Sequence, residues 1–292
     1  MKIVRRILIG AIALLGLATV AGLGTAWYVG AWQLLFPSHA HDSVAPELPA
    51  QLARPAVLVF TKTNSFRHED GIAAGAQLLQ EIAAHRGWGF FHTENGAVFN
   101  PEQLTRFDVV VFHNTSGDTL DAAQETAFQS WLEAGGGWVG THSSGDSSHK
   151  EWQWYQDTLI GGLFTFHIMG PQFQEARVIV EDASHPAAAK LPAEFTHTEE
   201  WYSWEESARA KGFHVILSID ETSYEPYARM FGEEQDLRMG DHPVVWSRCI
   251  GKGRALYSTL GHGADAYRTA EHPLLLEGAV AWAAGVEGDD CR

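Results

Sequence analysis

Short, unbroken apolar runs alternate with stretches of helical periodicity through the first half of the body, and this alternation restricts the possible folds more than any other feature. Ala56–Phe60 is a run of the kind found in strands that are covered on both faces. Apolar residues follow at helical spacing from Ile72 to Ala83, and Gly87 stands where a helix-ending glycine is expected. This segment predicts a strand, a polar loop and a helix.

The same unit then recurs. Val109–Phe112 predicts a second buried strand, and Asp121 with Gln124 predicts the capped start of a helix that buries Phe128. Trp138–Gly140 predicts a third strand. Because strands and helices alternate, we expect an α/β fold whose sheet is parallel and joined by right-handed crossovers.

The N-terminus predicts a membrane segment. Lys2, Arg5 and Arg6 precede an apolar run from Ile7 to Phe36, which is longer than the roughly 7 to 15 apolar residues of a cleavable signal and long enough for a spanning helix. Positive charge before the run predicts an anchored protein with its body on the extracytoplasmic (periplasmic) side. A long signal cleaved after Ser38-His39-Ala40 is the alternative.

The chain is therefore expected to divide into a membrane or signal anchor (1–36), a linker (37–54), one α/β domain (55–286) and an acidic tail (287–292). Cys249 and Cys291 have no CxxC spacing, and we expect no pairing between them. The formal net charge of −16 and the absence of a basic stripe argue against nucleic acid as a partner.

The loops at the strand ends hold the candidate site, because ligands of parallel sheets bind beyond the carboxyl ends of the strands. His142, in GGGWVGTHSSGD, directly follows a predicted strand, and its small neighbours permit the sharp turn on which other α/β enzymes place a nucleophile. An imidazole there can be a general base, a metal ligand or a hydrogen-bonding contact, or an ordinary structural histidine. Asp146 closes the same loop and is a candidate for substrate binding.

Two further loops hold candidates of the same kind. Arg67 and His68 follow the first strand, where the guanidinium either pairs with a neighbouring carboxylate or faces a ligand oxygen. His262 follows a later strand and is flanked by glycines, which permit close approach of a ligand. His167 and His242 are weaker candidates, since the first fits a core position and the second fits the start of a strand.

The stretch HTEEWYSW places two carboxylates beside three aromatic residues. Glu199 and Glu200 could accept hydroxyl hydrogens of a sugar while Trp201, Tyr202 and Trp204 cover its apolar face. An ordinary amphipathic turn accounts for the spacing equally well.

Cofactor motifs are missing from the sequence. It has no HExxH, no compact His/Cys cluster and no phosphate-binding glycine loop, so no cofactor is required by any motif. A divalent metal would have to be bound by residues from distant loops, for which His142, His262 and Glu200 are the candidates.

Seven motifs, in order between about residues 55 and 285, resemble the ThuA-like (trehalose-utilisation) domain family: TKTNSFRH, FDVVVFHNTSGD, GGGWVGTHSSGD, WQWYQDTLIGG, HTEEWYSW, MGDHPVVW and GRALYSTLGHG. The resemblance implies a flavodoxin-like, class I glutamine amidotransferase-like three-layer sandwich with a mainly parallel sheet. It also implies a role in the metabolism of trehalose or of oxidised (3-keto) glycosides, beside sugar oxidoreductases.

By this resemblance, His68 and Arg67 match the first loop of the family, His142 the turn that holds a cysteine in true amidotransferases, and His262 the final Gly-His-Gly. Glutaminase chemistry by a thiolate is therefore not expected. Glu199 and Glu200 match the acidic pair.

We expect an anchored enzyme that cleaves or isomerises a 3-keto-glycoside, as a hydrolase, lyase or isomerase. In this hypothesis His142 is the base or a metal ligand, Glu200 is its partner acid or base, and Trp201 with Trp204 holds the sugar ring. Arg67, His68 and His262 stabilise the developing enolate. Two alternatives remain: a non-catalytic carbohydrate-binding module that serves a partner oxidoreductase, and a metal-dependent small-molecule hydrolase.

Overall fold

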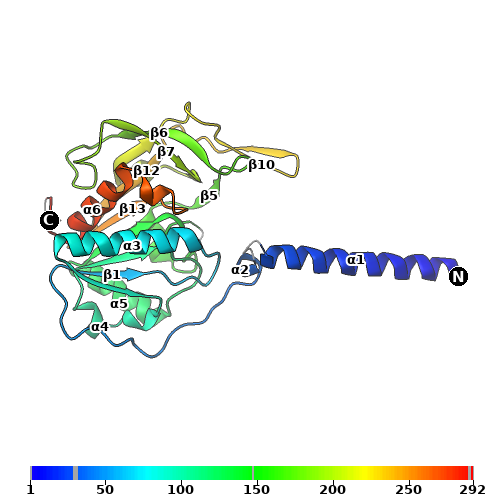
Figure 1. The fold of residues 1–292 in the computed structure, drawn as a ribbon, viewed down its shortest axis with the longest axis horizontal. Coiled ribbons are helices and arrows are strands. Elements are labelled where there is room, and N and C mark those ends of the chain that lie inside the picture. The colour runs from blue at the N-terminus through cyan, green and yellow to red at the C-terminus, as the bar shows by residue number, and fades with distance from the viewer. Residues whose placement is uncertain (1, 29–31, 147, 289–290, 292) are drawn as a thin grey trace.

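The computed structural model describes residues 2–28, 32–146, 148–288 and 291. A long helix, α1 (Lys2–Tyr28), projects away from an α/β body, and a short helix, α2 (Trp32–Leu35), lies between them (Figure 1). The segment Ile3–Tyr28 is long and apolar enough to cross a membrane, and none of it is buried against the body. By length and composition it fits either a membrane anchor or a signal sequence.

A nine-stranded mixed sheet, in the order β2-β1-β3-β4-β13-β12-β9-β6-β7, forms the centre of the body. Its first half is parallel and consists of β1 (Ala56–Phe60), β2 (Gly89–Thr93), β3 (Val109–His113), β4 (Gly137–Thr141) and β13 (Gly253–Ser258). Its second half is antiparallel and consists of β12 (Pro243–Ile250), β9 (His214–Ile219), β6 (Gln174–Val180) and β7 (Glu194–Glu199).

The predicted α/β class is confirmed, but the sheet is evenly mixed and not mainly parallel. The strands of the second half have no crossover helices between them: Gly251 and Lys252 alone join β12 to β13, which is long enough only for a hairpin. Two small two-stranded sheets extend this half, β5 (Phe164–His167) with β8 (Tyr202–Trp204) and β10 (Tyr227–Met230) with β11 (Glu233–Asp236).

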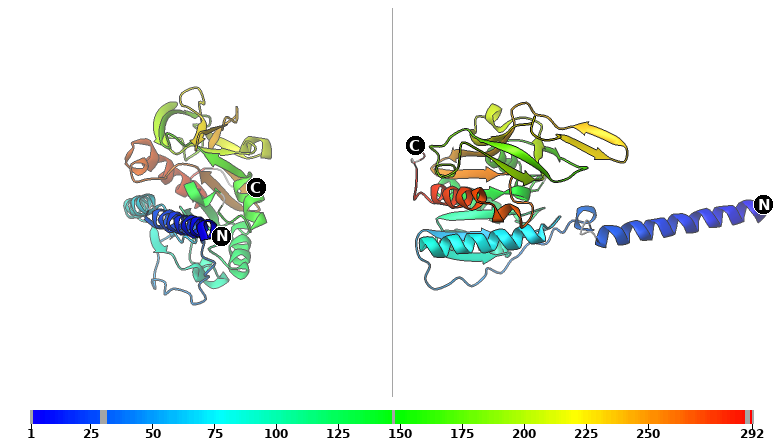
Figure 2. Two further views of the ribbon diagram at one scale, coloured as in Figure 1. Left: turned by 90° about the vertical axis from the view of Figure 1, so that its right-hand side faces the viewer. Right: turned by 45° about the horizontal axis from the view of Figure 1, so that its top comes forward.

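Helices cover both faces of the parallel half and complete a three-layer sandwich (Figure 2). Alternate residues of β1 enter different cores, since Val57 and Val59 pack with apolar residues of α3 (Glu69–Arg86) and α6 (Glu271–Ala283). Leu58 and Phe60 pack on the opposite face, with residues of α4 (Pro101–Leu104), α5 (Ala122–Glu133) and the π-helix η3 (Tyr155–Ile160). Four 3-10 turns complete the described elements: η1 (Gly96–Val98), η2 (His142–Ser144), η4 (Ala208–Lys211) and η5 (Ala266–Arg268).

The predicted local signals at the element ends are confirmed. Asp121 accepts hydrogen bonds from the backbone N–H groups of Ala123 and Gln124, which makes the capping box of α5. Gly87 ends α3 in the left-handed conformation, with φ of 70°. His142 also has a positive φ, 45°, directly after β4, as the predicted sharp turn requires.

The linker packs along the body and is not a free tether. The backbone N–H of Ser38 donates to the Asn64 carbonyl at 2.7 Å, and the side chains of Asn95 and Gln103 donate to carbonyls of the linker. The linker thus begins at the carboxyl end of β1 and runs along the sandwich to the start of the same strand (Figure 1).

The prediction that the cysteines remain unpaired is wrong. Cys249 of β12 and Cys291 of the tail form a disulfide, with 5.6 Å between their Cα atoms. The two cysteines are 42 positions apart and the sequence carries no pairing signal, because the contact arises when the chain after α6 returns to the sheet.

Buried histidines in the core predict a loss of stability in mild acid. Burial lowers the pKa of His113 and His149 to about 4, and burial together with the neighbouring His197 lowers that of His272 to about 3. Between those values and the ordinary value of 6.5 the unfolded chain binds more protons, so the free energy of unfolding falls as the pH is lowered through this window. We expect a loss of roughly 3 kcal/mol per histidine at pH 4, seen by urea unfolding at several pH values.

His272→Leu removes a ring whose nitrogens have no hydrogen-bond partner among the described residues, so it should flatten this pH dependence. His85→Gln, on the exposed last turn of α3, is the matched control and should leave the slope unchanged. Equal slopes in the two variants would show that buried His272 does not contribute.

Candidate functional site

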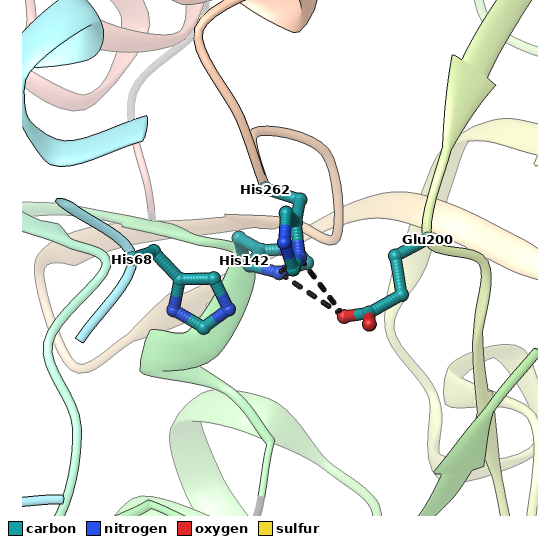
Figure 3. A group of neighbouring side chains, drawn as sticks. All are labelled: His68, His142, Glu200 and His262. Carbon is teal, nitrogen blue, oxygen red and sulfur yellow. Dashed lines mark hydrogen bonds and ion pairs between the residues drawn. The ribbon is translucent and has the colours of Figure 1, made fainter. Parts of the chain in front are cut away.

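Four side chains from distant parts of the sequence converge at the carboxyl edge of the sheet (Figure 3). They are His68 at the start of α3, His142 after β4, Glu200 after β7 and His262 in the loop after β13. One nitrogen or oxygen atom of each lies within 4.8 Å of the corresponding atoms of the others. The strand-end residues that the sequence singles out are thus brought into a single cluster.

His142 has a fixed orientation and tautomer. Its Nδ1 lies 2.8 Å from the Thr259 carbonyl oxygen, to which it can only donate, so Nε2 faces the cluster. The Tyr202 hydroxyl lies 2.9 Å from Nε2, and Nδ1 of His262 lies 3.2 Å from it. Although the residue is fully buried, hydrogen bonding to Glu200 and the charges of Glu199 and Glu200 raise the pKa of His142.

Glu200 is the anion of the cluster. Its Oε2 lies 3.1 Å from Nδ1 of His262 and 3.6 Å from Nε2 of His142, while Oε1 lies 3.1 Å from Nδ1 of His167 and accepts from Gln172 at 2.5 Å. Burial favours the neutral acid, but the hydrogen bonds from His142 and His262 outweigh it and lower the pKa of Glu200. The carboxylate is therefore ionised at neutral pH.

His68 completes the cluster as a neutral imidazole. Burial, followed by the nearby His142 and His262, lowers its pKa well below the ordinary value. Its ring lies edge-on to those two rings, with centroids 4.8 and 4.6 Å away. Nδ1 of His68 is buried and has no hydrogen-bond partner among the residues that the structure describes.

Glu199 holds the loop of His262 in place. Its carboxylate accepts hydrogen bonds from the backbone N–H groups of Gly261 at 2.7 Å and His262 at 3.2 Å. Burial opposes ionisation, yet His197, His142 and the Gly261 N–H lower the pKa of Glu199 to about 2. These bonds occupy both carboxylate oxygens, which favours a positioning role over the predicted direct contact with substrate.

The cluster fits a divalent cation. Three imidazoles and a carboxylate are donors that Zn²⁺ and similar transition metals accept. The hydrogen bond from His142 to Thr259 is the kind of outer contact that fixes a ligating ring, and His68 turns one ring nitrogen toward the other three side chains (Figure 3). Sequence reasoning named His142, His262 and Glu200 as candidate ligands, and the structure places His68 with them.

A cavity of about 1300 Å³ opens onto the cluster and exposes parts of His68, Glu199 and His262. Its wall is polar and apolar in equal parts, and the polar part includes Arg67, Glu69, Asp70, Gln77, Glu175, Thr196, Thr198, Asp265 and Arg268. Two aromatic rings, Phe66 and Phe173, interrupt this wall. The volume exceeds the range typical for small-ligand pockets and accommodates a molecule with more than one sugar ring.

The predicted aromatic platform is not in this cavity. Trp201 and Trp204 are 0% and 5% exposed and pack in the core, so the structure corrects the prediction that they hold a sugar ring. Trp201 follows the edge strand β7 and Trp204 lies in β8. The sequence spacing alone does not reveal that both side chains point into the core. Tyr202 is buried too, but its hydroxyl reaches His142 inside the cluster.

Two other predicted residues have protein partners. Arg67 lines the cavity but pairs with Glu69 at 3.0 Å and Glu94 at 2.7 Å, which is the internal pairing that the sequence left open. Asp146 accepts from the backbone N–H and hydroxyl of Ser148, and burial raises the pKa of its carboxyl to about 6.

Sequence reasoning missed several contributors. His167, only a weak candidate from the sequence, lies beside Glu200. Gln172, to which no sequence signal points, donates a hydrogen bond to the same carboxylate. Phe173 is 47% exposed, and its ring centroid lies 4.8 Å from that of His262. An aromatic residue in the otherwise polar sequence GPQFQE was the signal that could have identified Phe173.

His242 bonds the Tyr202 carbonyl and Glu221, and is structural.

Comparisons with known proteins agree with this architecture. The family described as ThuA, trehalose utilisation, matches residues 56–283. A ThuA-like protein of Bacteroides uniformis is 28% identical, with a TM-score of 0.68 over 82% of this chain and 95% of its own. A second, from Parabacteroides merdae, is 16% identical, with a TM-score of 0.57 over 78% and 89%, and shares the fold. No curated protein matches the chain.

The position of His262 depends on a glycine in α3, and this generates a prediction. A Cβ on Gly71 would lie 2.3 Å from the backbone oxygen of His262, which cannot move without displacing the loop. Alanine normally stabilises a helix relative to glycine by up to about 1 kcal/mol, but we expect Gly71→Ala to lower the free energy of unfolding by about 1–3 kcal/mol. Urea unfolding measures the change.

Gln80→Ala, at an exposed position of the same helix, is the control and should change stability little. If Gly71→Ala proved as stable as this control or more so, the close packing of α3 against the loop of His262 would be wrong.

Proposed function

Because the chain belongs to the ThuA, trehalose-utilisation family, which supports a role connected with carbohydrates, we propose that it is a metal-dependent enzyme that cleaves 3-keto-glycosides. The observation that carries the proposal is the convergence of His68, His142, Glu200 and His262 beside a cavity large enough for a disaccharide. A divalent cation held by these four side chains would bind the 3-keto oxygen and stabilise negative charge on it.

The proposed reaction is an elimination. A ketone at C3 acidifies the proton at C2, and its removal creates an enolate whose electrons expel the substituent at C1. The proton that leaves C2 enters the base, and the departing glycosidic oxygen takes up a proton in turn. Water can then add to the unsaturated sugar, which completes hydrolysis. The protein must supply a base, a proton donor and charge stabilisation.

His167 is the base that fits this scheme. Its Nδ1 lies 3.1 Å from Glu200, which leaves Nε2 to accept a proton, and its side chain is 20% exposed. A carboxylate that orients an imidazole through Nδ1 is the arrangement of hydrolytic triads. His142, the base in the sequence-based hypothesis, is fully buried and better suited to hold the cation.

The Tyr202 hydroxyl, inside the cluster beside His142, is the group that we propose as the proton donor for the leaving oxygen. It lies 2.9 Å from Nε2 of His142, and burial together with the nearby Asp146 and Glu200 raises its pKa well above the ordinary value. The group thus keeps its proton at neutral pH.

We also propose that the protein is anchored in a membrane with its body on the extracytoplasmic side. The length and exposure of α1 support an anchor. The Cys249–Cys291 disulfide supports the extracytoplasmic side, because disulfides persist in oxidising compartments.

The decisive experiment incubates the purified full chain with a 3-keto-disaccharide and with its unoxidised parent, before and after chelation and with divalent metals added back. We expect turnover of the oxidised sugar alone, loss of turnover on chelation and recovery with metal. Saturable binding without turnover would favour the carbohydrate-binding module instead. Full activity in metal-free protein would exclude the proposed mechanism.

Two histidine variants separate the roles of the cluster. His142→Ala should lose both bound metal and turnover, whereas His167→Gln should keep the metal and lose about 10²- to 10⁴-fold in kcat, as expected for a missing general base. Metal content by elemental analysis and steady-state kinetics measure these effects. His214→Gln, on the exposed start of β9, is the control and should change neither. Normal kcat in His167→Gln would assign the base elsewhere.

Phe173 replaces the buried tryptophans as the proposed sugar platform. An aromatic face covers the apolar side of a sugar ring, and such a contact contributes on the order of 1 kcal/mol. Phe173→Ala should therefore raise KM several-fold with little change in kcat, and Phe173→Tyr should restore it. Leu163→Ala, at an equally exposed apolar residue away from the cavity wall, is the control. An unchanged KM would remove Phe173 from the substrate site.

A further inference from the structure

The chain enters the body at the edge of the sheet that holds the cluster. Ser38 bonds to Asn64 in the loop after β1, and His39 and His41 contact Asp118 in the loop after β3. Ten peptide steps separate Tyr28, the end of α1, from Ser38, and a chain of that length spans at most about 35 Å. If α1 spans a bilayer, this edge of the body must lie close to its surface.

Aromatic residues around the end of α1 mark where that surface lies. Trp27, Tyr28, Trp32 and Phe36 are all exposed. Tryptophan and tyrosine concentrate at the level of the lipid headgroups. The membrane interface is therefore expected directly beside the point at which Ser38 joins the body.

The hairpin of β10 and β11 projects from the body toward the side from which α1 leaves (Figures 1 and 2). Its tip exposes apolar side chains, with Met230 at 40% exposure and Phe231 with no protein cover at all. Strands β10 and β11 pair in register up to Met230 and Glu233, so Phe231 and Gly232 form the turn.

The turn sequence is costly for a hairpin that serves only to connect two strands. Phe231 and Gly232 have φ values of 54° and 88°. Tight turns with two positive φ values prefer asparagine, aspartate or glycine at the first position, because a bulky side chain is disfavoured there. A phenylalanine held in this conformation and exposed to solvent gains nothing from the body of the protein.

Charge on the hairpin restricts the kind of membrane. Arg229 pairs with Glu225 and Glu234, and Arg238 pairs with Asp236, which leaves an excess of acidic groups behind the tip. Together with the net charge of −16, this disfavours anionic lipid and leaves apolar insertion as the source of affinity.

We propose that Met230 and Phe231 insert into the interfacial region of the bilayer that α1 spans, as a second contact that orients the body with its cluster edge toward the membrane. This inference concerns orientation and is independent of the proposed sugar chemistry, but it requires that α1 is retained as an anchor.

The test uses the full chain in phosphatidylcholine vesicles, with a nitroxide on the single free thiol of Phe231→Cys. The disulfide occupies both natural cysteines, so only the introduced thiol reacts. Ala84→Cys, exposed on the last turn of α3 at the opposite edge of the sheet, is the matched control. Electron paramagnetic resonance measures collisions of each label with oxygen, which concentrates in lipid, and with a water-soluble chromium complex.

We expect the ratio of oxygen to chromium accessibility to be several-fold higher at position 231 than at position 84. Equal ratios at both positions would overturn the proposal, as would recovery of the protein from cells without α1. A label at 231 that is shielded in native membranes but not in lipid vesicles would also overturn it, in favour of a protein partner. Sugar turnover by the same samples is a separate readout, so failure of one proposal does not imply failure of the other.

Discussion

The hydrogen bonds from the backbone of Gly261 and His262 to the Glu199 carboxylate are the contact on which the site depends. In the sheet, β7 is separated from β13 by β12, β9 and β6, and at about 4.8 Å per step a flat sheet would hold β7 and β13 roughly 19 Å apart. The end of β7 and the loop after β13 nevertheless meet, since the backbone N–H groups of Gly261 and His262 reach the Glu199 carboxylate. Glu199 thus ties the two halves of the sheet together at this edge, and Glu200, the next residue, lies beside His142 and His262.

The charge balance of the cluster depends on the position of Glu200. Glu200 brings one negative charge into a largely buried site where three imidazoles lie close together, with His142 and His262 nitrogens 3.2 Å apart. Nitrogens at this distance need a proton or a cation between them. Protonation of one ring neutralises Glu200, and burial together with the nearby His142 and His262 lowers the pKa of His68, which opposes a second proton there. The four side chains would all be satisfied by one divalent ion, and this is the argument for the proposed metal centre over an acid–base dyad.

The rule that ligands bind beyond the carboxyl ends of parallel strands predicts the site residues of the parallel half, because topology alone brings His68, His142 and His262 to one edge. The rule fails where the position of a residue depends on long-range tertiary packing. Nothing in HTEEWYSW indicates that Trp201 turns into the core while Glu200 turns into the site. The disulfide was missed for the same reason, since the return of the tail to Cys249 is a long-range event. His167 was undervalued because its role depends entirely on the placement of Glu200.

The proposed membrane orientation and the proposed reaction are connected through the supply of substrate. A 3-keto-glycoside must come from oxidation of a C3 hydroxyl, so the proposed reaction needs a dehydrogenase upstream, as the family resemblance implies. Ser38 holds the cluster edge within a short chain length of α1, so the proposed anchoring would raise the effective concentration of this protein for an oxidoreductase confined to the same membrane. A reactive ketone released at that surface then has a short path to the cavity. In the proposed scheme the anchor, the packed linker and the hairpin tip act together with the cluster, because each would shorten the time for which the oxidised sugar is free.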